Sequence, residues 1–138
     1  MSEFTNPTRE EIGDILKKYD KIAVVGLSDN PERTSYQISE AMQKAGYKII
    51  PINPKVKEVL GEKAYPSLLD VEEDFDIVNV FRRSEHLPDV AKEAVKTNAK
   101  VFWAQLGLEN EEAYRIAKDH GMTVIMDRCI KVEHALTK

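Results

Sequence analysis

Apolar residues along this chain fall into two patterns that alternate from one end to the other. Five short runs are almost continuously apolar, and the segments between them carry apolar residues three and four positions apart. The short runs predict strands that are buried on both faces, as in a parallel sheet, and the spaced residues predict amphipathic helices. The predicted strands are residues 22–27, 47–52, 76–81, 100–104 and 122–126.

Capping residues predict where the helices begin and end. Thr8 and Glu11 form the pattern of a capping box ahead of Ile12, Ile15 and Leu16, which predicts an N-terminal helix that packs on the core. Polar residues at the other helix starts and glycines beyond the helix ends predict the remaining boundaries. These residues are Thr34 with Gln37 in a second capping box, Gly46, Ser84, Asn110 and Gly121.

This order of elements predicts an α/β fold with a doubly wound, mainly parallel five-stranded sheet and helices on both of its faces. The length of 138 residues suits one domain, with a packing helix in residues 1–20 and a core in residues 21–133. Ligands of such sheets bind beyond the carboxyl ends of the strands. We therefore look for a site just after Leu27, Ile52, Phe81, Ala104 and Met126.

Composition and charge narrow the range of functions. Hydrophobic residues make up 42% of the chain and charged residues 32%, as in a folded globular domain. The net charge of −4 argues against nucleic acid as a partner, while a few cations can still form a local pocket for a small anion. We expect no signal peptide in residues 1–8 and no membrane helix, because no apolar run approaches ~20 residues. With one cysteine, a cytoplasmic location is expected.

The loop after the first predicted strand carries groups that bind phosphate. Gly26 allows a ligand to approach the backbone, Ser28, Thr34 and Ser35 supply hydroxyls, and Arg33 supplies a forked cation. The free amides at the start of the following helix also attract anions. Each residue alone is ordinary for a turn or a cap, but their clustering at a strand end favours a phosphate-binding loop.

The same loop lacks both common glycine-rich signatures. It is neither G-x-G-x-x-G nor G-x-x-x-x-G-K-[ST], so the dinucleotide fingerprint and the triphosphate loop are both absent. The end of the second strand, Ile52-Asn53-Pro54-Lys55, has no acid for a ribose diol, which argues against NAD. Lys55 is suited to a ribose phosphate, and it is equally well explained as a solvated loop lysine.

The other strand ends offer ligand-lining candidates and little catalytic chemistry. Phe81, Arg82 and Arg83 either line a groove or form a surface ion-pair patch, and Gln105 either binds an amide or stabilises its own loop. The histidines are too scattered for a metal site. Cys129 follows a positive charge, as a reactive thiolate does, but a free cysteine more often packs as a small hydrophobe.

Several loop motifs, taken in order, resemble the small stand-alone CoA-binding proteins. That family has the Rossmann-like fold of the CoA-binding domain of the succinyl-CoA synthetase α subunit. The resemblance covers residues 21–133 and rests on Val24-Val25-Gly26-Leu27-Ser28, then Pro31, Arg33, Ser35 and Tyr36, then Gly46-Tyr47, Ile52-Asn53-Pro54, Val80-Phe81-Arg82-Arg83, Trp103-Ala104-Gln105-Leu106-Gly107 and Met126-Asp127-Arg128-Cys129.

The resemblance implies a pose for coenzyme A along the strand ends. It assigns the phosphates to Gly26, Leu27, Ser28, Arg33, Thr34, Ser35 and Tyr36, the adenosine and its 3′-phosphate to Asn53, Pro54 and Lys55, and the pantetheine to Phe81, Arg82, Arg83, Gln105 and Gly107. The chain lacks the phosphohistidine segment and the ATP-grasp partner of the synthetase. The resemblance therefore implies no catalytic residue and no metal.

We accordingly expect a module that binds CoA or acyl-CoA without catalysis of its own. Two alternatives stay open. One is an NADP-dependent oxidoreductase, suggested by the phosphate-friendly end of the second strand, and the other is an interaction subunit that delivers CoA to an acyl-transfer enzyme. A homodimer is the other assembly considered.

Overall fold

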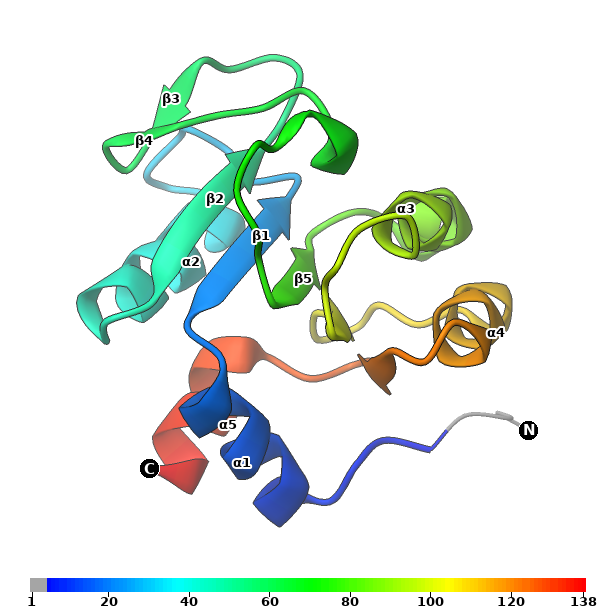
Figure 1. Ribbon diagram of the computed structural model, residues 1–138. Coiled ribbons are helices and arrows are strands. Elements are labelled where there is room, and N and C mark those ends of the chain that lie inside the picture. Colours follow the sequence, from blue (N-terminus) through cyan, green and yellow to red (C-terminus); the bar gives the residue numbers. More distant parts are fainter. Residues whose placement is uncertain (1–4) are drawn as a thin grey trace.

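Five parallel strands form the main sheet in the computed structural model, which describes residues 5–138 (Figure 1). They are β1 (Lys21–Val25), β2 (Lys48–Ile52), β5 (Ile77–Val80), β6 (Val101–Ala104) and β7 (Thr123–Ile125). Each overlaps one predicted apolar run, so the prediction of a doubly wound parallel sheet is confirmed. Residues 1–4, which the predicted domain includes, lie outside the described residues.

Helices cover both faces of this sheet (Figure 1). Helices α3 and α4 pack on one face, and α1, α2 and α5 pack on the other. Trp103 and Phe102, neighbours on β6, are both fully buried and point into opposite core clusters. The helices are α1 (Arg9–Lys18), α2 (Thr34–Lys44), α3 (Leu87–Ala94), α4 (Glu111–Asp119) and α5 (Ile130–Thr137), of which α5 was not predicted.

The segment between β2 and β5, which was predicted to be irregular, contains three short elements. Strands β3 (Glu58–Val59) and β4 (Glu62–Lys63) form a small antiparallel hairpin, and Leu68–Asp70 forms a 3-10 turn. A second 3-10 turn, Ser84–His86, precedes α3. The first of these turns lies beside the carboxyl edge of the sheet, where it contributes to the site described below.

The strand order β2-β1-β5-β6-β7 places the topological switch point between β1 and β5. The strand ends stay in register there, because the Phe81 amide donates to the Val25 carbonyl at 2.8 Å and the Gly26 amide donates to the Ile52 carbonyl at 2.9 Å. The loops that follow β1, β2 and β5 therefore leave the sheet at one common edge. This is the edge at which ligands of doubly wound sheets bind.

Two predicted helix caps are confirmed. The Thr8 hydroxyl accepts from the Glu11 amide, and the Glu11 carboxylate accepts from the Thr8 amide, which completes the capping box of α1. At α4, the Asn110 side chain accepts from the Ala113 amide at 2.9 Å. Both helix starts also carry acidic residues in their first turn.

Two other predicted caps are wrong. The N-cap of α2 is Arg33, so Thr34 is already helical and cannot cap. The side-chain amide of Gln37 instead donates to the Pro31 and Glu32 carbonyls before the helix. Ser84 begins the 3-10 turn three residues before α3, which is too far for capping. Its hydroxyl accepts from the Glu109 amide at 3.1 Å and so ties the loops after β5 and β6 together.

Candidate functional site

The loop between β1 and α2 is folded by its own hydroxyls. The Ser28 amide donates to the Ser35 hydroxyl oxygen at 3.1 Å, and the Asn30 amide donates to the Ser28 hydroxyl oxygen at 3.0 Å. Each hydroxyl keeps its own hydrogen as a donor. The two serines therefore shape the loop and retain a group that can donate to an anion.

The start of α2 differs from the starts of α1 and α4. Its N-cap, Arg33, makes no side-chain capping bond, and its first turn contains no acidic residue. The amides of the first turn and the positive end of the helix dipole are therefore left without a side-chain acceptor. An uncapped helix start of this kind is suited to a phosphate group.

Asn53 joins the end of β2 to the end of β1. Its side-chain amide donates to the Leu27 carbonyl at 2.9 Å, and its side-chain oxygen accepts from the Lys55 amide at 2.9 Å. The Leu27 side chain is fully buried in the core, so only its backbone belongs to the site. Asn53 thus positions the loop that carries Lys55.

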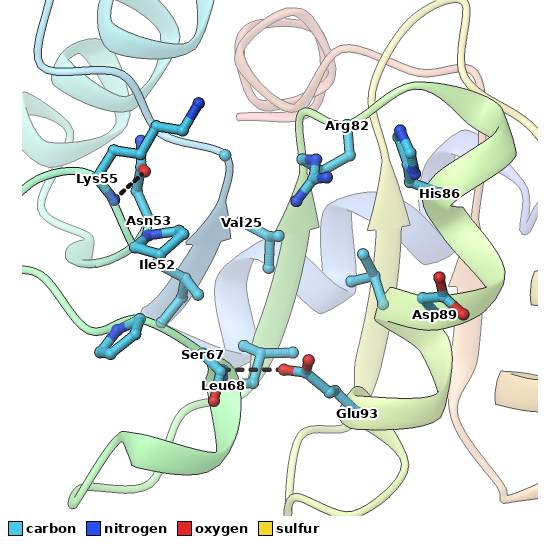
Figure 2. Close-up of a pocket in the computed structure, with 14 residues that line it drawn as sticks. Val25, Ile52, Asn53, Lys55, Ser67, Leu68, Arg82, His86, Asp89 and Glu93 are labelled. Carbon is cyan, nitrogen blue, oxygen red and sulfur yellow. Dashed lines mark hydrogen bonds between the residues drawn. The ribbon is translucent and has the colours of Figure 1, made fainter.

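A cavity of about 450 Å³ opens at the switch point, and we call it the switch-point cavity (Figure 2). Its walls come from the ends of β1 and β2, the first 3-10 turn, the loop after β5, and α3. The lining residues are Val25, Gly26, Ile52, Asn53, Pro54, Lys55, Pro66, Ser67, Leu68, Arg82, His86, Asp89, Val90 and Glu93.

Charges in the switch-point cavity are spread over opposite sides. Figure 2 shows Lys55 on one side and Arg82 with His86 on the other, while Asp89 and Glu93 lie further along α3. Among the ion pairs within residues 5–138, none involves the side chain of Lys55 or Arg82. These cations are therefore available to a bound anion.

A second cavity of about 490 Å³, which we call the apolar groove, lies along the same edge between α2 and α5. Most of its lining side chains are apolar. The full set of lining residues is Thr34, Ile38, Phe81, Arg82, Arg83, Gln105, Leu106, Leu108, Cys129 and Val132. Arg82 lines both cavities, so the two are neighbours along the carboxyl edge of the sheet.

Nine of the fifteen predicted site residues line one or both of these cavities. The switch-point cavity contains Gly26, Asn53, Pro54, Lys55 and Arg82, and the apolar groove contains Thr34, Phe81, Arg82, Arg83 and Gln105. The remaining predicted residues line neither cavity, and these are Leu27, Ser28, Arg33, Ser35, Tyr36 and Gly107. Leu27, Ser28 and Arg33 lie in the loop that joins β1 to α2. Ser35 and Tyr36 lie in the first turn of α2, and Gly107 follows β6.

Gln105 is used within the protein. It is only 4% exposed, its side-chain amide donates to the Asn79 side-chain oxygen, and its own oxygen accepts from the Ile130 amide at 3.3 Å. These bonds connect β5, β6 and the start of α5. The sequence left two interpretations of Gln105, ligand binding through an amide or stabilisation of its own loop. The hydrogen bonds made by both its side-chain nitrogen and its side-chain oxygen support loop stabilisation.

The sequence did not predict the residues of the switch-point cavity that lie outside the loops after the strands. Ser67 and Leu68 come from the 3-10 turn, and His86, Asp89 and Glu93 come from the start and outer surface of α3. The Glu93 carboxylate accepts from the Leu68 amide at 3.2 Å and holds the turn against the helix. The charged positions on α3 have the pattern of a solvated helix face, so no signal in the sequence distinguishes them.

Two other kinds of feature are absent from residues 5–138. No helix in that range combines the length and the apolar character needed to cross a membrane. Within the same range, no three His, Cys, Asp or Glu side chains gather closely enough to hold a metal ion. The predicted site residues that lie close together in the structure are those that line the two cavities at the carboxyl edge of the sheet.

Comparisons with known proteins point to one family. A family model described as a CoA binding domain matches residues 20–135. The chain is 61% identical over 133 residues to the uncharacterized protein YneT of Bacillus subtilis, which covers 96% of this chain and 98% of that protein. A structure of a hypothetical protein from Pyrococcus horikoshii superposes with a TM-score of 0.92 at 36% identity, over 99% of both chains.

A larger enzyme contains a related segment. The chain is 31% identical over 120 residues to an ADP-forming acetate–CoA ligase of Methanocaldococcus jannaschii. The match covers 80% of this chain and 17% of the ligase. The similarity is therefore to one part of that enzyme.

Proposed function

Because this chain belongs to the CoA binding domain family, we propose that it binds coenzyme A or an acyl-CoA across the carboxyl edge of its sheet. The observation that carries the proposal is the uncapped, acid-free start of α2 beside the Gly26 loop. The diphosphate accepts hydrogen bonds from the amides and hydroxyls of this loop, and Arg33 adds a charge-assisted contact.

The adenosine and its 3′-phosphate occupy the switch-point cavity in this proposal. Lys55 and Arg82 supply positive charge on opposite sides of the cavity, and neither is engaged in an ion pair among the described residues. The absence of an acid at the end of β2 favours a phosphate over a free ribose diol. Lys55 is therefore our candidate for the 3′-phosphate.

The pantetheine arm passes Arg82 and enters the apolar groove. Arg82 lines both cavities, and Thr34 at the start of α2 lines the groove. An arm that leaves a diphosphate held at α2 thus has a continuous path along the strand ends. We assign no catalytic step to the chain, because none of the side chains in this path is arranged as a nucleophile with a base.

Calorimetry with CoA, dephospho-CoA and NADPH at one salt concentration tests this function. We expect CoA to bind, dephospho-CoA to bind more weakly, and NADPH to give no heat of binding. Failure of CoA to bind refutes the proposal. Tighter binding of NADPH than of CoA would instead favour an NADP-dependent oxidoreductase.

A second candidate function is favoured by the ligase match. Since the related segment is part of an acetate–CoA ligase, the chain can serve as a separate subunit that presents CoA to an acyl-transfer enzyme. Affinity capture with the tagged chain, with and without CoA, tests this role. Capture that recovers no acyl-transfer enzyme in the presence of CoA counts against it.

A further inference from the structure

We propose that the apolar groove binds the acyl chain of a CoA thioester, so that the protein prefers apolar acyl-CoAs to free CoA. This inference rests on the proposed function and adds the class of acyl group. It predicts that affinity rises with the length of an unbranched, uncharged acyl chain.

Two large apolar side chains on the rim of the groove are exposed to solvent. Leu106 is 70% exposed and Val132 is 49% exposed, and both line the groove. Among the described residues, only Leu69 and Leu136 are other large hydrophobic side chains with comparable exposure. Clustered exposed apolar surface in a concave site favours an apolar ligand.

The position of the groove identifies the ligand as part of the same molecule. The groove and the switch-point cavity share Arg82, so a ligand anchored by its nucleotide extends into the groove with its other end. In CoA, that end is the thiol to which the acyl group is attached. When the nucleotide is bound in the switch-point cavity, the apolar group that reaches the groove is therefore the acyl chain.

The polar groups of the groove are poorly suited to a charged acyl group, because Arg82 is taken up by the nucleotide phosphates in the proposed pose, and Gln105 and Arg83 have partners within the protein. Both ends of the buried Gln105 side chain are bonded to Asn79 and Ile130, and Arg83 lies 3.9 Å from the Glu85 carboxylate. An ionised carboxylate at the end of an acyl chain would lose water without gaining a buried partner among Ile38, Leu106 and Val132. The groove thus selects for chains without a terminal charge.

A series of thioesters measures this preference. A fully buried methylene lowers a dissociation constant by about fourfold, and the groove is open on one side, so we expect about twofold per methylene. From acetyl-CoA to hexanoyl-CoA, four methylenes then lower the dissociation constant by about tenfold or more. Butyryl-CoA should bind at least about fivefold more tightly than succinyl-CoA, which has the same number of acyl carbons.

Matched leucine variants locate the effect. Leu106→Asn should remove at least half of the acetyl-to-hexanoyl gain in binding free energy, because it places an amide on the groove wall. Leu136→Asn is the control, since Leu136 is 57% exposed, does not line the groove, and lines a separate pocket between α5 and α1. Both side chains are exposed, so neither variant should fail to fold.

Cys129 gives a second readout that is independent of affinity. It is the single cysteine of the chain, it is half-buried, and it lines the groove. At saturating ligand, hexanoyl-CoA should slow its alkylation by iodoacetamide at least about threefold more than acetyl-CoA does, because the longer acyl chain fills the groove beside the thiol and neither thioester has a free thiol of its own.

The outcomes separate this inference from the proposed function. A dissociation constant that falls along the series, with Leu106→Asn but not Leu136→Asn reducing the fall, supports the acyl groove. Equal affinities for CoA, acetyl-CoA and hexanoyl-CoA, or tighter binding of succinyl-CoA than of butyryl-CoA, overturn the acyl groove and leave CoA binding intact. Failure of every CoA compound to bind overturns the proposed function itself.

Discussion

The carbonyl oxygen of Phe81 lies where a side chain on Gly26 would begin. A Cβ atom built on Gly26 would be 2.6 Å from that oxygen, and the backbone of Gly26 has a φ of +87°. The loop after β1 and the loop after β5 therefore approach each other more closely than any side chain allows. This contact at the switch point brings the Gly26 loop beside Arg82, which lines both cavities.

Gly26→Ala should destabilise the protein by at least about 2 kcal/mol, because the left-handed backbone alone costs ~1 to 2 kcal/mol and the contact with Phe81 adds to it. The matched control is Gly121→Ala, since Gly121 has a φ of +84° and open space around it. We expect that control to lose only the backbone cost. Urea denaturation measures both, and equal losses would show that the close approach to Phe81 is unimportant.

Arg33→Ala should weaken CoA binding by about tenfold or more, since one charge-assisted contact is worth ~1.5 to 3 kcal/mol. Lys44→Ala, at the other end of α2, makes the same change in charge far from the proposed phosphates. Titration calorimetry on both variants checks the prediction. An unchanged dissociation constant for Arg33→Ala would place that residue outside the site.

Lys55→Ala should weaken the binding of CoA about tenfold and leave the binding of dephospho-CoA nearly unchanged, because Lys55 is assigned to the 3′-phosphate. Lys57→Ala serves as the control, since Lys57 lies two residues further along and does not line the switch-point cavity. Calorimetry measures the dissociation constants of CoA and dephospho-CoA for both variants and for the native protein. Equal weakening for the two ligands would exclude a specific role at the 3′-phosphate.

Tyr47 should make stability depend on alkaline pH. Its hydroxyl donates to the Leu16 carbonyl, and burial, followed by the nearby Asp20 carboxylate, raises the pKa of its phenol above the usual 10.0. The folded state holds the proton more tightly than the unfolded state, so this stabilisation is complete below pH 10 and is lost as the pH rises above it.

The Tyr47→Phe variant tests that dependence. Removal of the hydroxyl should lower the free energy of unfolding by about 1 kcal/mol at pH 7, through the lost bond to Leu16. It should also reduce the further loss of stability between pH 9 and about pH 11. Urea denaturation over that range measures both effects. A variant as sensitive to high pH as the native protein would contradict the assignment to Tyr47.

The strands were predictable because burial on both faces requires an uninterrupted apolar run. All four residues of β6 are buried and apolar. All four residues of β5 are buried as well, and its one polar side chain, Asn79, is paired with Gln105. The Gly26 loop was predictable for a related reason, since its position at a strand end follows from the strand pattern. The local sequence was therefore enough to predict the sheet and the position of the Gly26 loop.

Helix α5 could not be predicted in this way, because a charged residue occupies part of its buried face. Glu133 is only 3% exposed and pairs with Arg9, whose side-chain Nε lies 3.2 Å from the carboxylate. That partner is 124 residues away in the chain, so no local pattern reveals it. The same applies to Gln105, whose partners Asn79 and Ile130 come from two other elements.

Backbone amide shifts in a titration with CoA test the central claim most directly, because they report where the ligand binds as well as whether it binds. We predict the largest changes at the amides of Gly26, Ser28, Thr34 and Ser35. Further changes are expected at Arg82, Arg83, Gln105 and Leu106, which line the groove, and little change at the opposite edge near Asp20 and Lys100. An absence of shifts at the β1–α2 loop, or the largest shifts at that opposite edge, would contradict the account.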